Sequence, residues 1–116
     1  MRIKAVFATT AMVVAATGAA ILPSSPAFAV SCPDNGWAIL DGRVGQFFAQ
    51  NFINIRTGPS TVCTSLGQGQ MSHTAQVDCY KEGQNGTWTH LFDFNTGVEG
   101  WSKDSLLVGT GALVHC

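Results

Sequence analysis

The sequence predicts a small all-β domain, a barrel or a sandwich, that disulfides stabilise. Short apolar and β-branched runs alternate with turn signals, and 13 of the 116 residues are glycine. Apolar side chains at helical spacing occur only in residues 45–52, a stretch too short to make an independent helix. Four cysteines in so small a chain are typical of a disulfide framework.

Residues 1–29 have the order of parts that defines a secretory signal peptide. Positive residues come first, an uncharged apolar run follows at residues 5–22, and Ala27-Phe28-Ala29 provides an A-x-A cleavage pattern. We expect cleavage after this pattern to release residues 30–116 as a secreted, extracellular domain with no membrane partner. Secretion also favours persistent disulfides, because the compartments outside the cytoplasm are oxidising.

Two other interpretations of this leader stay open. Residues 5–22 are long enough to span a bilayer as a retained anchor, although threonines and a glycine dilute the run. Cys32, three residues beyond the cleavage pattern, is a candidate for lipidation, but Ala29 stands where such signals usually have leucine. Lipidation would also leave an odd number of cysteines in an oxidising compartment.

The charge balance excludes two classes of partner. Loss of the leader removes Arg2 and Lys4, so four basic residues remain against seven acidic ones. Nucleic acids and anionic membranes both require clustered basic charge, so we expect neither as a partner. The released chain is one small domain with little room for a cofactor site, and we expect a monomer without a cofactor.

The turn signals divide the chain into expected strands and connections. The strands are residues 52–56, 62–66, 73–81, 87–94, 98–102 and 107–114. Asn85-Gly86 is a type I′ hairpin signal between the third and fourth strands. Ala75, Val77 and Cys79 alternate with polar residues and should share one face, and residues 103–106 fit a single 3₁₀ turn.

Three pairings of the four cysteines are open from the sequence. Cys63 and Cys79 flank a glycine-rich turn region and would be neighbours if they lay on adjacent strands. Cys32 and Cys116 lie near the two ends of the released chain, and the ends of small domains are often close together. We therefore favour a 63–79 bridge inside a 32–116 bridge.

Four segments follow one another at a characteristic spacing. They are Ile53-Asn54-Ile55-Arg56-Thr57-Gly58-Pro59-Ser60, the Leu66-Gly67 step, Trp88 in a G-x-W-x strand, and Gly100-Trp101-Ser102-Lys103-Asp104-Ser105-Leu106. This series resembles the bacterial SH3-like domain family, with its N-V-R-x-G-P-S opening and its closing G-W-V-x-x-x-Y-L segment. The resemblance covers about residues 53–107. The chain departs from the pattern at Cys63, at Cys79, at Gln68-Gly69-Gln70 and at Ser102.

The resemblance implies a small SH3-like β-barrel with an N-terminal extension. The expected parts are a leader (1–29), an extension held by Cys32 and Trp37 (30–52), a barrel (53–108) and a C-terminal strand or tail (109–116). The family motif also implies structural roles at Asn54, Arg56, Gly58, Pro59 and Gly100. Arg56, for example, would hydrogen-bond backbone carbonyls or a carboxylate near its turn.

The resemblance further implies a non-enzymatic module attached to the cell wall, with peptidoglycan peptides as ligand. We expect an aromatic groove to bind a peptide that is poor in side chains, by stacking and main-chain hydrogen bonds. The expected groove residues are Tyr80, Trp88, Phe92 and Trp101, with Asp93 and Glu99 available to amines of the ligand. Packing in the core or at its edge is the alternative interpretation of Trp88 and Trp101.

Catalysis and metal binding are weakly indicated. Asp78-Cys79-Tyr80 faintly resembles a nucleophile motif, but a disulfide at that cysteine would remove the thiolate. His73, His90 and His115 lack the spacing of zinc ligands. Residues 93–99 carry oxygens at alternate positions but lack a full calcium loop. We expect neither enzyme activity nor a bound metal.

A protein-interaction or structural domain without a cell-wall ligand is the rival hypothesis. The exposure of Phe47, Phe48 and Phe52 would distinguish the two hypotheses. An exposed patch of these rings would mark a protein interface, whereas packed rings would belong to the core.

Overall fold

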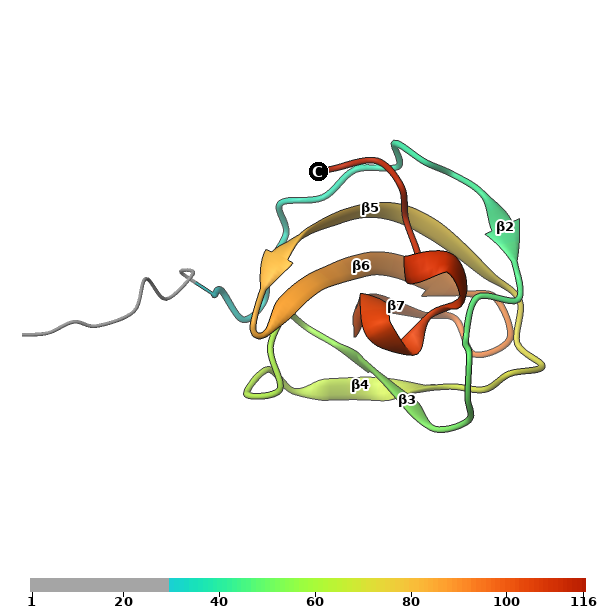
Figure 1. The fold of residues 1–116 in the computed structure, drawn as a ribbon. Helices are drawn as coiled ribbons and strands as arrows, with labels where there is room; N and C mark the ends of the chain where they lie inside the picture. Colours follow the sequence, from blue (N-terminus) through green and yellow to red (C-terminus); the bar gives the residue numbers. More distant parts are fainter. Residues whose placement is uncertain (1–29) are drawn as a thin grey trace, which may run out of the picture.

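The structure, a computed structural model, describes residues 30–116; the expected leader lies outside the described residues. One antiparallel sheet of six strands forms the domain, in the order β2-β5-β6-β7-β3-β4 (Figure 1). The strands are β2 (Val44–Gly45), β3 (Ile53–Arg56), β4 (Ser65–Gly69), β5 (Ala75–Gly83), β6 (Gly86–Asp93) and β7 (Val98–Lys103). The all-β prediction is confirmed, and within the described chain the only helical pieces are two 3₁₀ turns, η2 (Asp104–Leu106) and η3 (Val108–Thr110).

The hairpin of β5 and β6 is the longest paired unit of the sheet. Its turn has Gln84 and Asn85 between the paired Gly83 and Gly86. Asn85 has φ of 57°, a left-handed conformation that asparagine tolerates better than most residues. The hairpin is as expected, but the type I′ turn is not, because only one of its two central residues has positive φ.

A β-bulge changes the side-chain alternation along β5. Val77 pairs with Leu91 while Cys79 pairs with the preceding residue of β6, His90, so Asp78 is an extra residue. Cross-strand partners share a face, and neighbours along a strand alternate. The expectation that Val77 and Cys79 share a face is therefore wrong.

The core lies on the inner face of the curved sheet. Its members are Phe48, Ile53, Ile55, Ala75, Val77, Leu91, Leu107 and Ala112, all at most 5% exposed. Phe48 comes from the extension, and its ring lies over Gly69 of β4, where an added Cβ would come within 2.2 Å of it. The extension therefore contributes to the core as well as to the sheet, through β2.

The last ten residues do not form the expected strand 107–114. The 3₁₀ turn at η2 is confirmed, but a second turn, η3, follows it. Gly109, Thr110 and Gly111 all have positive φ, which is incompatible with an extended strand. Beyond them the tail runs beside β5, where Tyr80 donates its N–H to Val114 and accepts one from Cys116.

The disulfides join Cys32 to Cys63 and Cys79 to Cys116, so the favoured pairing is wrong. The extension begins beside the turn after β3, with Asp34 N–H bonded to the Thr57 carbonyl at 2.9 Å, which brings Cys32 next to Cys63. The C-terminal tail lies along β5, next to Cys79. Each bridge fastens one end of the described chain to the sheet.

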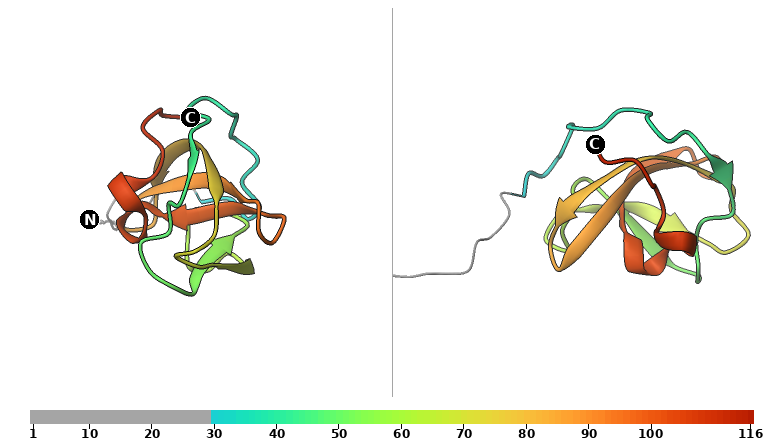
Figure 2. Two further views of the ribbon diagram at one scale, coloured as in Figure 1. Left: turned by 90° about the vertical axis from the view of Figure 1, so that its right-hand side faces the viewer. Right: turned by 45° about the horizontal axis from the view of Figure 1, so that its top comes forward.

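Both ends of the described chain protect the outer edge of β5. The N–H groups of Leu40 and Asp41 donate to the Asp78 carbonyl, and the tail bonds to Tyr80 farther along the strand. Figure 2 shows the extension and the tail running over the same side of the domain. An edge that is already hydrogen-bonded cannot pair with another chain. Within residues 30–116, no helix has the length and apolarity needed to cross a bilayer.

Candidate functional site

The six residues expected to line the groove lie on both faces of the sheet. Alternation along β6 places Trp88, His90 and Phe92 on the outer face and Thr89, Leu91 and Asp93 on the inner one. Tyr80 pairs with Thr89 and thus faces inward. Tyr80 and Asp93 therefore cannot share a groove with Trp88, Phe92, Glu99 and Trp101.

Trp101 of β7 is completely buried under the extension. Its Nε1 donates to the Asp34 carbonyl at 3.1 Å, and the Lys81 ammonium lies 5.1 Å from its ring centroid. Asp34 also holds that ammonium, with an Nζ–Oδ1 distance of 3.0 Å. Trp101 anchors the extension and offers no open face to a ligand.

Trp88 is also buried, with 3% of its surface exposed. Its Nε1 donates to the Gln84 carbonyl at 2.8 Å in the β5–β6 turn. The Lys103 ammonium lies 5.5 Å from the ring centroid and donates to the carbonyls of Gln84 and Asn85. Both tryptophans are thus buried, but under the turn and the extension on the outer face, not among the core residues of the inner face.

Asp93 is fully buried and already paired. Its Oδ2 lies 2.7 Å from His73 Nδ1, and its Oδ1 accepts the N–H of Asn95 at 2.9 Å. Its expected role toward an amine of the ligand does not fit this geometry. Glu99, by contrast, is exposed on the outer face.

The outer face carries an aromatic surface that includes a residue outside the expected groove. Trp37 of the extension stacks on His90, with ring centroids 3.7 Å apart and planes at 11°. Phe92 meets Phe94 edge to face, with centroids 5.0 Å apart. With Ile39 and Glu99 these residues form what we call the outer groove.

The outer groove consists of two adjoining hollows. One, of about 210 Å³, is lined by Trp37, Ile39, Gln76, Asp78, Phe92, Phe94 and Glu99. The other, of about 170 Å³, is lined by Pro33, Asp34, Asn35, Trp37, Thr57, Leu66, His90, Glu99, Gly100 and Trp101. Trp37 and Glu99 belong to both hollows, so an aromatic plane and a carboxylate lie where they meet.

A hydrogen-bonded group beneath Trp37 fixes its position. His90 is buried, and its Nδ1 lies 2.7 Å from Asp78 Oδ2. Gln76 Nε2 donates to the other carboxylate oxygen of Asp78 at 3.1 Å. The edge of His90 also meets Trp101, with centroids 5.3 Å apart. The stacking platform is therefore rigid, which reduces the entropy lost when a ligand stacks on it.

Five of the seven acidic side chains have a basic or histidine partner. The pairs are Asp34–Lys81, Asp41–Arg43, Asp78–His90, Glu82–His115 and Asp93–His73. Among residues 30–116, only Glu99 and Asp104 lack such a partner. The two remaining basic residues, Arg56 and Lys103, donate to backbone carbonyls. Glu99 and Asp104 are thus the two carboxylates of the described domain that lack a basic or histidine partner, and neither of the two remaining cations pairs with them.

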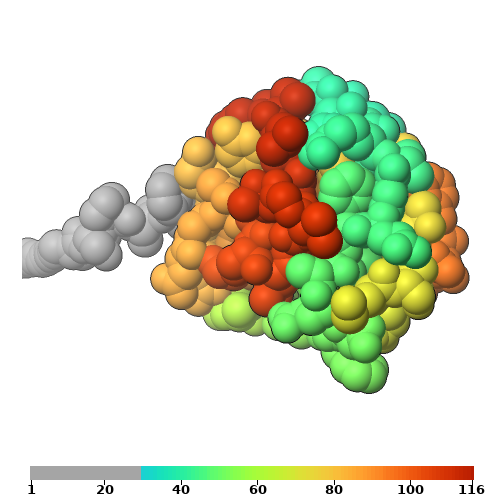
Figure 3. Space-filling view, turned by 45° about the vertical axis from the view of Figure 1, so that its right-hand side comes forward, coloured from blue at the N-terminus to red at the C-terminus, as the bar shows by residue number. Residues whose placement is uncertain are grey.

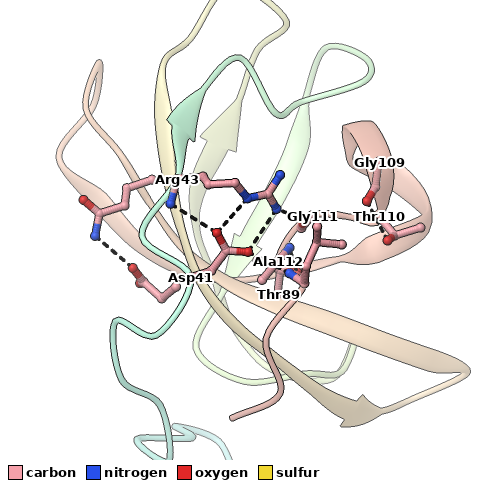
Figure 4. Close-up of polar contacts among 10 residues, drawn as sticks. Asp41, Arg43, Thr89, Gly109, Thr110, Gly111 and Ala112 are labelled. Atoms are coloured by element: carbon pink, nitrogen blue, oxygen red, sulfur yellow. Dashed lines mark hydrogen bonds and ion pairs between the residues drawn. The ribbon is translucent and has the colours of Figure 1, made fainter.

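Asp41 and Arg43 tie the extension to the C-terminal tail (Figure 4). Arg43 Nε donates to Asp41 Oδ1 at 2.7 Å, and its Nη2 donates to the Gly111 carbonyl at 2.8 Å. Asp41 Oδ2 accepts the N–H of Leu113 at 2.7 Å. The hydrogen bond from Arg43 holds the pKa of the Asp41 carboxyl below its ordinary value. Figure 3 shows the two segments in contact on the surface.

The motif residues near the turn after β3 make contacts that stabilise the fold. Arg56 Nη1 donates to the carbonyls of Thr61 and Cys63 at 3.2 and 3.0 Å, so it stabilises the turn after β3. Asn54 Oδ1 accepts the hydroxyl of Ser65 on β4 at 2.9 Å. The turn itself contains Pro59, which is buried.

Two motif glycines allow segments to approach closely. A Cβ on Gly58 would lie 2.2 Å from the Ser31 carbonyl oxygen of the extension. A Cβ on Gly100 would lie 2.3 Å from the Arg56 carbonyl oxygen, where β7 meets β3. Only glycine fits these contacts without a shift of the backbone.

The cysteines and histidines that could support catalysis or metal binding are engaged in disulfides or hydrogen bonds. All four cysteines are in disulfides, so Cys79 has no thiolate to offer as a nucleophile. Each histidine hydrogen-bonds a carboxylate. No group of three or more His, Cys, Asp or Glu side chains within residues 30–116 is arranged to hold a metal ion.

The three phenylalanines that distinguish the two functions do not form one patch. Phe48 is buried in the core, and Phe47 packs against that core while the Arg43 guanidinium lies 5.2 Å from its ring centroid. Phe52 alone is open, with 69% of its surface exposed. A single exposed ring is ordinary on a protein surface and does not mark an interface.

No protein-family model, curated protein or solved structure matches the chain significantly. Membership of the SH3-like family therefore stays a prediction that depends on the motifs of residues 53–107. Trp37, the centre of the outer groove, lies outside these motifs. The sequence signalled it only as a tryptophan among polar and small residues of the extension, where we expected an anchor.

Proposed function

We propose that the protein is a secreted, non-enzymatic binding module that takes cell-wall peptides in the outer groove. The observation that carries the proposal is the open aromatic plane of Trp37, fixed on the His90 ring beside the unpartnered carboxylate of Glu99. Two disulfides are consistent with a place outside the cell. The motifs of residues 53–107 and the curved antiparallel sheet support an SH3-like barrel as the scaffold.

The chemistry of the outer groove suits a peptide with small side chains and a free amine. Such a peptide exposes its backbone, and flat aromatic rings are good contacts for it. Trp37 and Phe92 offer these rings, and Glu99 between the hollows would attract an ammonium group. The excess of acidic over basic residues in the domain also favours a positively charged ligand.

A protein partner is the second candidate, and one observation favours it. Apolar side chains that line the groove are exposed to solvent, namely Ile39 at 61% and Phe94 at 51%. A cluster of exposed apolar residues is typical of protein interfaces. A folded partner would cover this rim, whereas a thin peptide would contact mainly Trp37 and Phe92.

Co-sedimentation of the purified, oxidised protein with isolated peptidoglycan tests the proposal. We expect binding that weakens after the wall amines are acetylated, and a similar loss in Glu99→Gln on untreated walls. Phe52→Ala removes a more exposed aromatic ring outside the groove and should bind like the wild type. Absence of wild-type binding at every salt concentration would overturn the cell-wall ligand and leave the protein partner to be sought.

A further inference from the structure

A second cavity lies on the opposite face of β6, beneath the C-terminal tail. Its volume is about 350 Å³, within the range of small-ligand sites. Its lining residues are Tyr80, Thr87, Asp104, Thr110, Ala112 and Leu113. None of these residues lines the outer groove, and the sheet separates the two sites.

A buried carboxylate lies in this cavity. Asp104 is only 6% exposed, and its Oδ1 accepts the hydroxyl of Thr89 at 2.5 Å. That hydroxyl in turn accepts the N–H of Ala112 at 3.0 Å, which fixes its direction. Asp104 has no basic partner within residues 30–116, because the neighbouring Lys103 turns to the carbonyls of the β5–β6 turn. A buried charge without a counterion is unfavourable, and a bound cation would relieve it.

The wall of the cavity is held in place from outside. Arg43 bonds the Gly111 carbonyl and Asp41 bonds the Leu113 N–H, on the side of the tail seen in Figure 4. The Cys79–Cys116 disulfide fastens the end of the same tail. A ligand would therefore meet a cavity that is already formed, which limits the ordering that binding requires.

We propose that this cavity binds a primary ammonium group on a short apolar stem, with Asp104 as its counterion. A single carboxylate matches a single positive charge, whereas Ca²⁺ and Mg²⁺ require several oxygen ligands and more negative charge. The hydroxyls of Tyr80, Thr87 and Thr110 supply acceptors for the remaining N–H groups. Ala112 and Leu113 offer apolar contact to the stem.

The electrostatics of Asp104 agree with this geometry. Burial raises the pKa of the Asp104 carboxyl above its ordinary value, while the hydroxyls of Thr87 and Thr89 oppose the shift. Without a ligand, the ionised form of Asp104 is therefore less favourable than it would be in water. An ammonium ion at the carboxylate would remove part of that disadvantage, so the site gains more from a charged ligand than from a neutral one of the same shape.

Titration of the oxidised protein with n-butylammonium, followed by amide NMR at pH 7, tests the proposal. We expect saturable shifts at Thr87, Asp104 and residues 110–113. The neutral probe 1-butanol should bind about tenfold or more weakly, since hydrogen bonds to charged groups are the stronger ones. This comparison uses the wild type alone and so does not depend on the folding of any variant.

Two variants separate this site from the outer groove. Asp104→Asn keeps an oxygen for the Thr89 hydroxyl and should lose most of its n-butylammonium binding while retaining cell-wall binding. Glu99→Gln should show the reverse. Equal binding of n-butylammonium and 1-butanol, no saturable binding, or shifts centred on Trp37 and Phe92 would each overturn the proposal. None of these outcomes depends on whether the wall is the ligand of the outer groove.

Discussion

The indole of Trp37 lies flat on the imidazole of His90, although the two residues are far apart in the sequence. This contact makes the N-terminal extension part of the candidate site. The Cys32–Cys63 bridge and the Lys81–Asp34 ion pair hold the extension before Trp37, and the N–H groups of Leu40 and Asp41 hold it after Trp37 by bonding the Asp78 carbonyl. The proposed binding by the outer groove would thus depend on a segment that precedes residues 53–107.

Trp88→Ala should reduce stability without acting on the outer groove directly. The ring is buried against the β5–β6 turn, and its removal leaves a cavity. Substitutions of this type lower the free energy of unfolding by about 3–5 kcal/mol. Urea unfolding measures the change. A variant as stable as the wild type would contradict the burial of Trp88.

Peptide mapping of the oxidised protein should recover the Cys32–Cys63 and Cys79–Cys116 pairs. Paired replacement of either bridge by serine should lower the free energy of unfolding by about 4 kcal/mol, because the bridges close loops of 31 and 37 residues. Unfolding in urea, with and without reductant, checks this value. Recovery of a Cys63–Cys79 peptide would contradict the described path of both chain ends.

Gly100→Ala should destabilise the domain by about 1–3 kcal/mol, the usual effect of forcing an extra carbon into a packed site. The new Cβ would lie 2.3 Å from the Arg56 carbonyl oxygen, and a backbone cannot yield as a flexible side chain does. Gly45→Ala is the matched control, because its nearest contact, a carbon of the Phe47 ring, is at 3.6 Å. Thermal unfolding of both variants makes the comparison; equal effects would contradict the close approach of β3 and β7.

Asp104 should give the stability of the protein a distinct pH dependence. Its pKa is raised in the folded state, so between the ordinary value of 3.8 and the raised value the folded protein holds more protons than the unfolded chain. The stability of the wild type relative to Asp104→Asn should therefore be highest in acid and should fall as the pH rises through this window. Urea unfolding of both proteins from acid to neutral pH measures the difference. A difference that grows with pH would contradict the burial of an uncompensated carboxylate.

Local patterns predicted those parts of the fold that depend on local chemistry. Alternation and turn residues located β5, β6 and β7 to within about two residues, a usual margin for strand ends. The disulfide pairing was out of reach, because it depends on the path of both chain ends over the sheet. The bulge at Asp78 reversed the expected face of Cys79, and bulges leave little trace in the alternation of a single strand.

The sequence predicted only part of the candidate site, because segments distant in the sequence decide which residues stay open. Phe92 and Glu99 lie on the outer face, as a groove on that face requires. Trp88 and Trp101 were expected beside them, but the β5–β6 turn and the extension cover these rings. Which of several aromatic rings stays open depends on what lies over it, and the covering segments here are distant in sequence.

Binding of the Trp37→Ala variant to isolated peptidoglycan, measured beside the wild type and Phe52→Ala, tests whether the outer groove is the ligand site. If the ligand binds in the outer groove, Trp37→Ala should lose most of the binding while its circular dichroism stays native, because a large aromatic ring supplies much of the contact area of a stacked peptide. Phe52→Ala should bind as the wild type does. Wild-type affinity in a folded Trp37→Ala variant would show that the ligand does not bind in the outer groove.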